Sequence, residues 1–323
     1  MNRNRLQRRD FHRACVQGVA ATAMLGGLAS ERIAVGRGPI ARSGPAAIRL
    51  GLSAYSLRPM FRFFKGRLQS QDSIKTPLTI LGFLDFCRDL HVEASELTGY
   101  FLPPASEQDP LPSDHQLKTI RRAAFERGLT ISGTAIGNNF TGRSKSQLDD
   151  EIALAKRWIR KAAVLGAPHV RLFAGKSKEL SEDASRLTQA IDAIAVCADV
   201  AADCGIMLGI ENHGGLDGDQ MLAIMRAVQS PWVGMNLDTG NFHTEDPYRD
   251  IERCLPYAVN IQVKTEMKSP DRRVYPADLD RIGKLVRESG YQGFAVLEYE
   301  GDDDGDRMAT VRRAMDDLRS RWS

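Results

Sequence analysis

The chain has 323 residues, of which 42% are hydrophobic, and a formal net charge of +3. This length is sufficient to bury the core of one large α/β domain. The charge excess is small and comes partly from arginines near the N-terminus, so it gives no support to a nucleic-acid partner.

The N-terminal segment has the features of an export signal. Arg8 and Arg9 begin an RRDF pattern similar to a twin-arginine signal, and an apolar run of small residues follows over residues 14–29. A bilayer span needs roughly 20 residues, so we expect no stable membrane anchor after signal cleavage; a retained anchor is the alternative. We therefore expect residues 1–46 to be the signal and a flexible leader, and residues 47–323 to be the domain of a periplasmic or otherwise extracytoplasmic protein.

The first predicted strand covers residues 48–54. Residues 55–77 are too polar and irregular to predict regular structure, and their LRPMFRFFKGR segment places four cations among apolar side chains. A long loop of this kind at the active-site face of a barrel is commonly a lid or a substrate-recognition loop. A tolerated insertion is the alternative.

Helical periodicity and short apolar runs alternate along the rest of the chain. One predicted helix begins at Asp114 and ends at Gly128, as expected for an N-cap and a C-terminal glycine. Right-handed crossovers between parallel strands close eight strands and eight helices into a (β/α)8 TIM barrel. A doubly wound sheet is disfavoured because no G-x-G-x-x-G follows the first strand. Helices are expected at residues 78–90, 114–128, 148–165, 182–204, 219–229, 247–255, 277–289 and 306–320, and further strands at residues 92–97, 129–136, 169–173, 205–211, 233–238, 258–264 and 293–298.

The last four predicted strands each carry a polar, metal-capable side chain at or near the C-terminal end. They are Glu211, Asp238, Gln262 and Glu298. The active site of a TIM barrel is built at this end of the strands, so we expect the four side chains to form one ring. Three carboxylates and an amide oxygen suit Mn²⁺ or Mg²⁺, with Co²⁺ or Zn²⁺ tolerated. Neutralisation of the carboxylates by Arg or Lys across the barrel is the alternative.

Seven segments between residues 48 and 318 carry a family resemblance. They are LGLSAYSLR, VEASELTGYFLP, ISGTAIGNNF, IENHGG, NLDTGNF, NIQVKTE and VLEYEG. Together they resemble the xylose isomerase-like TIM barrels of the sugar phosphate isomerase/epimerase superfamily. The resemblance implies a divalent metal held by a Glu, an Asp, a His or Gln, and a Glu from strands five to eight. Those positions match Glu211, Asp238, Gln262 and Glu298.

The chain departs from the epimerase-like members of this superfamily at two places. Gln262 stands at a position that is often His, an arrangement also found in hydroxypyruvate isomerase-like relatives. The His often found after Asp238 is replaced within the run from Thr239 to Phe242, and His243 follows. The first departure leaves metal binding in place but bears on its selectivity.

The expected activity is that of a divalent-metal-dependent isomerase or epimerase of a free sugar, keto-sugar or polyol. The reaction would be proton transfer through a metal-bound enediolate, with the metal polarising the carbonyl. Glu211 and Glu298 would each serve as metal ligand and as base or acid toward one face of the substrate. An epimerase needs two such carboxylates, whereas an isomerase or a lyase needs one.

Two further residues are predicted to be catalytic. His213, just after the fifth strand, would orient the substrate or carry a proton; a loop histidine bonded to backbone is the alternative. Lys264 would neutralise an enediolate oxygen, since two-residue alternation points it the same way as Gln262. An ion pair with Glu298 or Glu266 is the alternative for Lys264.

The remaining expectations concern ligands and partners. Substrate contacts are expected from Glu96, Asn212, Asn241 and His243, with pairing to an arginine as the alternative for Glu96. The expected partner is a small-molecule carbohydrate, and homo-oligomer formation is left open. Two other functions stay open: a metal-dependent lyase or dehydratase acting on a 3-keto sugar or cyclic polyol acid, and a non-catalytic sugar-binding barrel.

Overall fold

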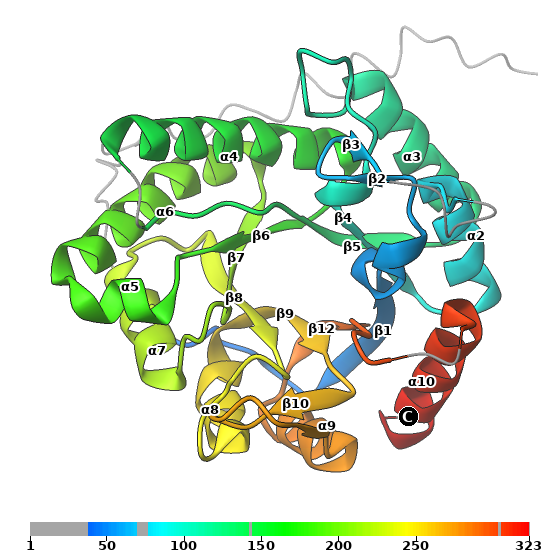
Figure 1. Cartoon of the computed structure of the whole chain (residues 1–323). Helices are drawn as coiled ribbons and strands as arrows, with labels where there is room; N and C mark the ends of the chain where they lie inside the picture. Colours follow the sequence, from blue (N-terminus) through cyan, green and yellow to red (C-terminus); the bar gives the residue numbers. More distant parts are fainter. Residues whose placement is uncertain (1–37, 70–76, 142–143, 303–304, 323) are drawn as a thin grey trace, which may run out of the picture. The chain divides into compact units, whose positions relative to one another are not determined.

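Eight parallel strands form a closed barrel in the order β1-β12-β9-β8-β7-β6-β5-β4 (Figure 1). The computed structural model describes residues 38–69, 77–141, 144–302 and 305–322, so the predicted export signal lies outside the described residues. The predicted (β/α)8 TIM barrel is confirmed. The barrel strands are β1 (Ala47–Ser53), β4 (Ala94–Thr98), β5 (Thr130–Ala135), β6 (His169–Phe173), β7 (Met207–Glu211), β8 (Val233–Asp238), β9 (Ala258–Val263) and β12 (Gln292–Leu297).

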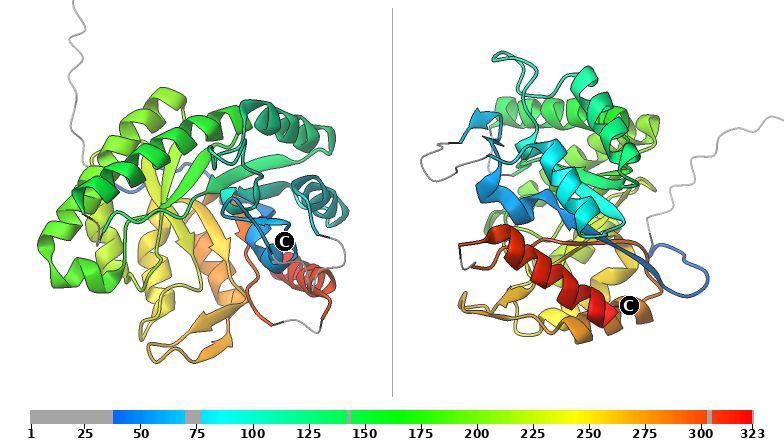
Figure 2. Two further views of the ribbon diagram at one scale, coloured as in Figure 1. Left: turned by 45° about the horizontal axis from the view of Figure 1, so that its top comes forward. Right: turned by 90° about the vertical axis from the view of Figure 1, so that its right-hand side faces the viewer.

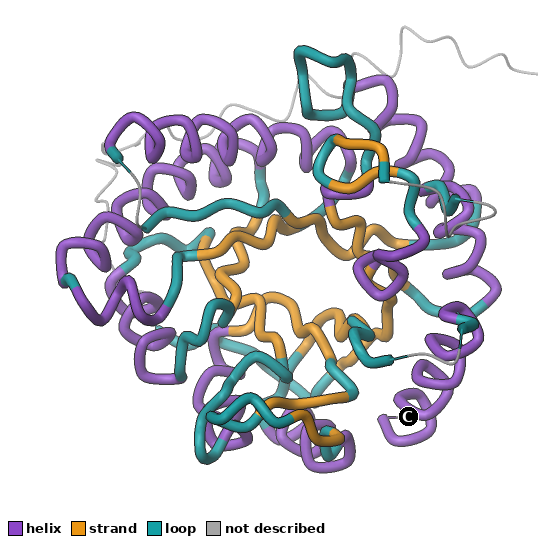
Figure 3. The backbone as a smooth tube through the Cα atoms, viewed as in Figure 1, coloured by secondary structure: helices purple, strands orange, loops and turns teal. Residues whose placement is uncertain are grey.

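Helices surround the barrel on the outside (Figure 3). Their ends follow the local sequence: Ser113 forms a capping box before α3, and Gly166 ends α4 in the left-handed conformation. Within the described ranges no helix combines the length and apolar character that membrane crossing requires. The helices are α2 (Ile80–Asp89), α3 (Asp114–Glu126), α4 (Lys145–Leu165), α5 (Ser177–Glu182), α6 (Ala184–Cys204), α7 (Gly218–Ala227), α8 (Pro247–Cys254), α9 (Leu279–Glu288) and α10 (Arg307–Trp322).

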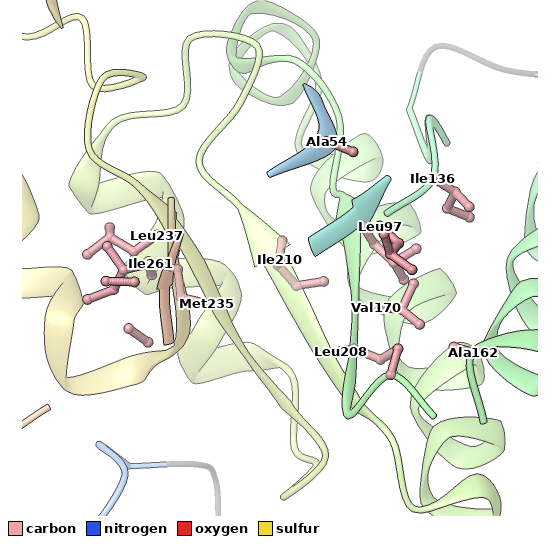
Figure 4. Close-up of a cluster of buried hydrophobic side chains, with 14 of the residues drawn as sticks. Ala54, Leu97, Ile136, Ala162, Val170, Leu208, Ile210, Met235, Leu237 and Ile261 are labelled. Atoms are coloured by element: carbon pink, nitrogen blue, oxygen red, sulfur yellow. The ribbon is translucent and has the colours of Figure 1, made fainter. Parts of the chain in front are cut away.

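Side chains along each strand point alternately to the outside of the barrel, toward the helices, and to its interior. Leu208 and Ile210 of β7 belong to the core between strands and helices, which Figure 4 shows in part. Gly209 faces the other way: a Cβ there would lie 3.0 Å from the Cβ of Asn236 on β8. The same alternation directs Glu211 into the barrel interior.

Two predicted segments differ from the structure. The predicted helix over residues 182–204 corresponds to α6, which begins at Ala184, where the N-cap Asp183 accepts a hydrogen bond from the Ser185 backbone N–H. The short helix α5, which ends at Glu182, lies in a segment where no helix was predicted. The predicted irregular loop after β1 contains the 3₁₀ helix η1 (Ala54–Met60) and a hairpin of β2 (Phe63–Phe64) and β3 (Arg67–Leu68). Strands of two residues are too short to show alternation in a sequence. The 3₁₀ helices η2 (Gly99–Phe101) and η3 (Leu255–Tyr257) and the hairpin of β10 (Glu266–Lys268) and β11 (Val274–Pro276) complete the chain.

Gly133 on β5 leaves room for the ring of His169 on β6. A Cβ at position 133 would lie 2.0 Å from His169 Cε1, and the His169 Nδ1–H donates to the Ser132 carbonyl at 2.8 Å. We expect Gly133→Ala to lower the free energy of unfolding by about 2 kcal/mol, as overpacking of a tight core does. Urea unfolding measures this loss. The loss should shrink in a His169→Ala background, and an equal loss in both backgrounds would contradict the steric explanation.

Burial also makes His169 a source of pH-dependent stability. Burial, together with the nearby Arg171, lowers the pKa of His169 to about 4, against the hydrogen bonds offered by Ser132 and Asn236. Between pH 6.5 and 4 the unfolded chain therefore binds more protons at this site than the folded chain. The contribution of His169 to the free energy of unfolding is complete above pH 6.5 and falls by roughly 3 kcal/mol as the pH drops to 4. The stability difference between the wild type and His169→Gln, measured by urea unfolding, should decrease over this range; a constant difference would contradict the assignment.

Candidate active site

A cavity of about 190 Å³ opens where the barrel strands end. In the side view of Figure 2, the β2–β3 hairpin lies at this end of the barrel, whereas residues 38–46 lie at the opposite end. The cavity brings together several side chains predicted from the sequence. These are Glu211, His213, Asn241, Lys264 and Glu298.

Arg171 neutralises one side of the cavity. It projects from β6, is 4% exposed, and places its Nε 2.9 Å from Glu211 Oε2. Its Nη1 donates to the Ile136 carbonyl at 2.7 Å, and its guanidinium carbon lies 4.1 Å from the centre of the Phe173 ring. Asn241 Nδ2 donates to the other Glu211 oxygen at 3.1 Å. Glu211 is therefore fixed by a buried cation and an amide.

Lys264 neutralises the opposite side. Its Nζ lies 3.4 Å from Asp238 Oδ2 and 3.4 Å from Glu298 Oε2, and it also pairs with Glu300. The ion pair with Glu298 considered from the sequence is present, while the observed partners do not include Glu266. Lys264 and Asp238 are buried, whereas the Glu300 side chain is 47% exposed at the rim. The ammonium group thus bridges buried and rim carboxylates.

Burial raises the pKa values of three carboxyl groups to the range of neutral pH. It raises the pKa of Glu211 to about 7 against the opposing effect of Arg171, and raises the pKa of Asp238 to about 7 against that of Lys264. It raises the pKa of Glu298 to about 8, again opposed by Lys264. Burial alone would lower the pKa of Lys264, but Asp238, Glu298 and Glu300 raise it, so the amine stays charged. Groups that titrate near pH 7 in a cavity are suited to proton transfer.

Glu96 lies beneath the cavity and is fully buried. Its carboxylate accepts hydrogen bonds from Ser53 Oγ at 3.1 Å and Gln262 Nε2 at 3.2 Å, and Asn260 Nδ2 lies at 3.4 Å. Gln262 Oε1 in turn accepts from Asn236 Nδ2 at 2.7 Å. The structure thus places Glu96 away from the cavity lining, in contrast to its predicted contact with substrate. Its acceptors are occupied by Ser53 on the adjacent strand β1 and by Asn260 and Gln262 of β9, which is not adjacent to β4 in the barrel, and sequence spacing does not reveal such contacts.

Asn212 also differs from its predicted role. Its Nδ2 donates to the Asp238 carbonyl at 2.8 Å and its Oδ1 accepts from the Asp238 N–H at 2.8 Å. Because both polar atoms are occupied by backbone, Asn212 joins the ends of β7 and β8 rather than facing the cavity. His243 is half-buried outside the cavity lining, where burial, Arg272 and Lys268 lower its pKa.

His213 lies in the cavity wall as predicted. Its ring centre is 4.2 Å from that of Phe173, and the two planes are tilted by 31°. The His213 side chain is exposed at the cavity, and partial loss of hydration lowers its pKa below the ordinary value, with further lowering by Arg171 and Lys264. A neutral imidazole at neutral pH can accept or donate a hydrogen bond to a bound molecule.

Several cavity residues were not identified from the sequence. Arg171 had a recognisable signal, since it is the one acidic or basic side chain other than histidine in the apolar strand HVRLF. Glu300 follows the predicted strand end by two residues. The others come from loops after early strands or from a strand end, and include Tyr55, Phe64, Lys65, Tyr100 and Phe173.

The donor groups at this site suit a divalent cation. The buried carboxyl groups of Glu211, Asp238 and Glu298 lie at the ends of neighbouring strands, beside the buried cations Arg171 and Lys264. Carboxylate oxygens are suitable donors to a divalent ion. Among the residues that the structure describes, no three His, Cys, Asp or Glu side chains are arranged to hold a metal. The ammonium group of Lys264 lies between Asp238 and Glu298, 3.4 Å from an oxygen of each.

The closed barrel and the acid–base cluster at its mouth define an enzyme of the (β/α)8 class. Residues 84–321 match the profile of the family described as "Xylose isomerase-like TIM barrel", and the chain belongs to this family. No curated protein shows significant sequence similarity to the chain.

Solved structures with the same fold include two sugar epimerases. D-psicose 3-epimerase, determined in the presence of D-fructose, is 17% identical, with a TM-score of 0.64, and the match covers 85% of this chain and 99% of that chain. The 3-keto-D-glucoside 4-epimerase from E. coli is 14% identical, with a TM-score of 0.63 and coverage of 84% and 99%. A xylose isomerase-like protein from Mycobacterium smegmatis in complex with magnesium is 20% identical, with a TM-score of 0.59 and coverage of 86% and 98%. At these identities the likeness establishes the fold.

Proposed function

We propose that the protein is a sugar isomerase or epimerase that transfers a proton at a carbon next to a carbonyl group. The observation that supports this proposal is the pair Glu211 and Glu298, which line one cavity from β7 and the end of β12. Their pKa values of about 7 and about 8 allow either group to accept or donate a proton near neutral pH. His213 and Asn241 line the same cavity and supply hydrogen bonds that orient hydroxyl groups.

The cavity chemistry supports a free sugar, keto-sugar or polyol as substrate. Tyr55, Phe64, Tyr100 and Phe173 provide ring faces, and polar side chains stand between them.

The same residues would hold a divalent cation. Asp238, Glu298 and Glu211 would be its ligands, and Gln262 would join them by releasing the hydrogen bond that its Oε1 accepts from Asn236. This oxygen-rich set favours Mn²⁺, with Mg²⁺, Co²⁺ or Zn²⁺ as alternatives. A bound cation of this kind supplies Lewis acidity that makes a proton next to a carbonyl easier to remove. Without a cation, Arg171 pairs with Glu211 and Lys264 pairs with Asp238. Glu96 fixes the Gln262 side chain by accepting a hydrogen bond from its Nε2.

The N-terminal sequence supports export by a twin-arginine-type signal. An enzyme outside the cytoplasm would meet free sugars more often than sugar phosphates. Fractionation of cells that express the complete chain, compared with an Arg8→Lys, Arg9→Lys variant, tests this localisation.

The proposed activity is tested by solvent exchange. Free ketohexoses, aldoses and cyclic polyols are incubated in D₂O with the protein and Mn²⁺, and ¹H NMR follows loss of the proton next to the carbonyl. An isomerase or epimerase replaces that proton by deuterium and loses no water from the product. A product lighter by one water identifies a dehydratase instead, and binding without exchange of any proton identifies a sugar-binding barrel.

A further inference from the structure

Lys264 occupies a position between two groups that would bind a cation. Its Nζ is equally far, 3.4 Å, from an oxygen of Asp238 and from an oxygen of Glu298. The Lys264 side chain is 8% exposed, and those of Asp238 and Glu298 are 1% and 8% exposed, so solvent screens these contacts weakly. A positive charge that is covalently part of the chain therefore neutralises the pair when no metal is bound.

Glu300 gives this ammonium group a third partner outside the pair. Glu300 is 47% exposed and makes the closest contact with Lys264. It lines the catalytic cavity and also a neighbouring cavity of about 560 Å³ on the side of Tyr55 and Arg58. A lysine has four flexible carbon–carbon bonds in its side chain, so the ammonium can leave Asp238 and Glu298 while it stays paired with Glu300.

We infer that Lys264 is a displaceable internal counter-ion, which competes with a divalent cation for Asp238 and Glu298 and moves onto Glu300 when the cation binds. The inference rests on the metal-binding part of the proposed function. Lys264 keeps the empty site stable, because two buried carboxylates without a cation would be costly. Glu300 lowers the cost of metal entry by retaining the displaced ammonium.

The test is a double-mutant cycle on Mn²⁺ affinity, measured by the electron paramagnetic resonance signal of free Mn²⁺ in titrations of the purified chain. Lys264→Gln removes the competitor and should tighten Mn²⁺ binding about tenfold, a usual size for direct coupling. Glu300→Gln removes the outer partner and should weaken binding about tenfold. In the Lys264→Gln background, Glu300→Gln should weaken binding by less than about threefold, because no ammonium group remains to be retained.

Lys65 provides the matched control. It is an exposed cation that lines the same cavity, and its observed contacts are with the Phe64 and Tyr100 rings rather than the carboxylates. Lys65→Gln should change Mn²⁺ affinity less than about threefold, whereas general electrostatics would make it resemble Lys264→Gln.

The outcomes separate the inference from the proposed function. Additive effects of Lys264→Gln and Glu300→Gln would overturn the competition, even if the enzyme is active. Mn²⁺ binding by neither the wild type nor Lys264→Gln would overturn both the competition and the metal requirement. Glu300→Gln leaves Lys264 with its two buried partners and is expected to fold, so wild-type Mn²⁺ affinity in that variant would overturn the competition even if Lys264→Gln is unstable. Circular dichroism without metal verifies the fold of each variant.

Discussion

Replacement of Glu298 by glutamine is expected to lower the rate of proton exchange with solvent about a thousandfold, within the usual range for loss of a general acid or base. Glu298 is 6% exposed, lines the cavity, and has a pKa of about 8 because it is buried beside other carboxyl groups. Glutamine has nearly the same shape but cannot accept a proton. The expected loss is in kcat, which ¹H NMR in D₂O measures at saturating sugar and Mn²⁺.

Two comparisons make this result specific. Glu252→Gln on the exposed side of α8 removes one carboxylate far from the cavity and should leave kcat unchanged. Glu211→Gln should also abolish turnover in an epimerase, since each face of the carbon needs its own proton carrier. An isomerase would retain exchange in one of the two variants. Full activity of Glu298→Gln with Mn²⁺ bound would remove Glu298 from the reaction.

The barrel could be predicted because its strands are short and apolar on both faces. The predicted strands over residues 169–173 and 233–238 coincide with β6 and β8. Parallel strands covered by helices lack polar alternation, so a polar residue at the strand end stands out. This contrast led directly to Glu211 and Asp238.

The partners of those carboxylates could not be predicted in the same way. Arg171 meets Glu211 across 40 positions of sequence, and Glu96 meets Gln262 across 166. Such pairs depend on the register between strands, which hydrophobic patterns do not give. The aromatic wall depends on loop conformations, such as the turn at Lys65 and Gly66, where both residues have positive φ.

Loss of the Arg171 charge is expected to destabilise the metal-free protein by about 3 to 5 kcal/mol, as removal of one partner from a buried ion pair does. Arg171→Met keeps much of the side-chain volume but leaves Glu211 without its cation at 2.9 Å. It also leaves the Ile136 carbonyl without the donor at 2.7 Å. Urea unfolding in EDTA at pH 8 measures the loss.

The expected loss of stability depends on the burial of the ion pair, and the exposed ion pair of Arg157 and Asp109 provides a control. Arg157 lies 2.7 Å from Asp109 with 49% of its side chain exposed, so Arg157→Met should cost less than about 1 kcal/mol. Adding Glu211→Gln to Arg171→Met should recover stability, because it removes the uncompensated charge that the single change leaves buried. Equal losses at the two arginines, or no recovery in the double variant, would show that Arg171 acts by packing alone. A larger loss at Arg171 than at Arg157, together with recovery in the double variant, would establish that the folded chain tolerates the buried carboxylates because Arg171 and Lys264 neutralise them.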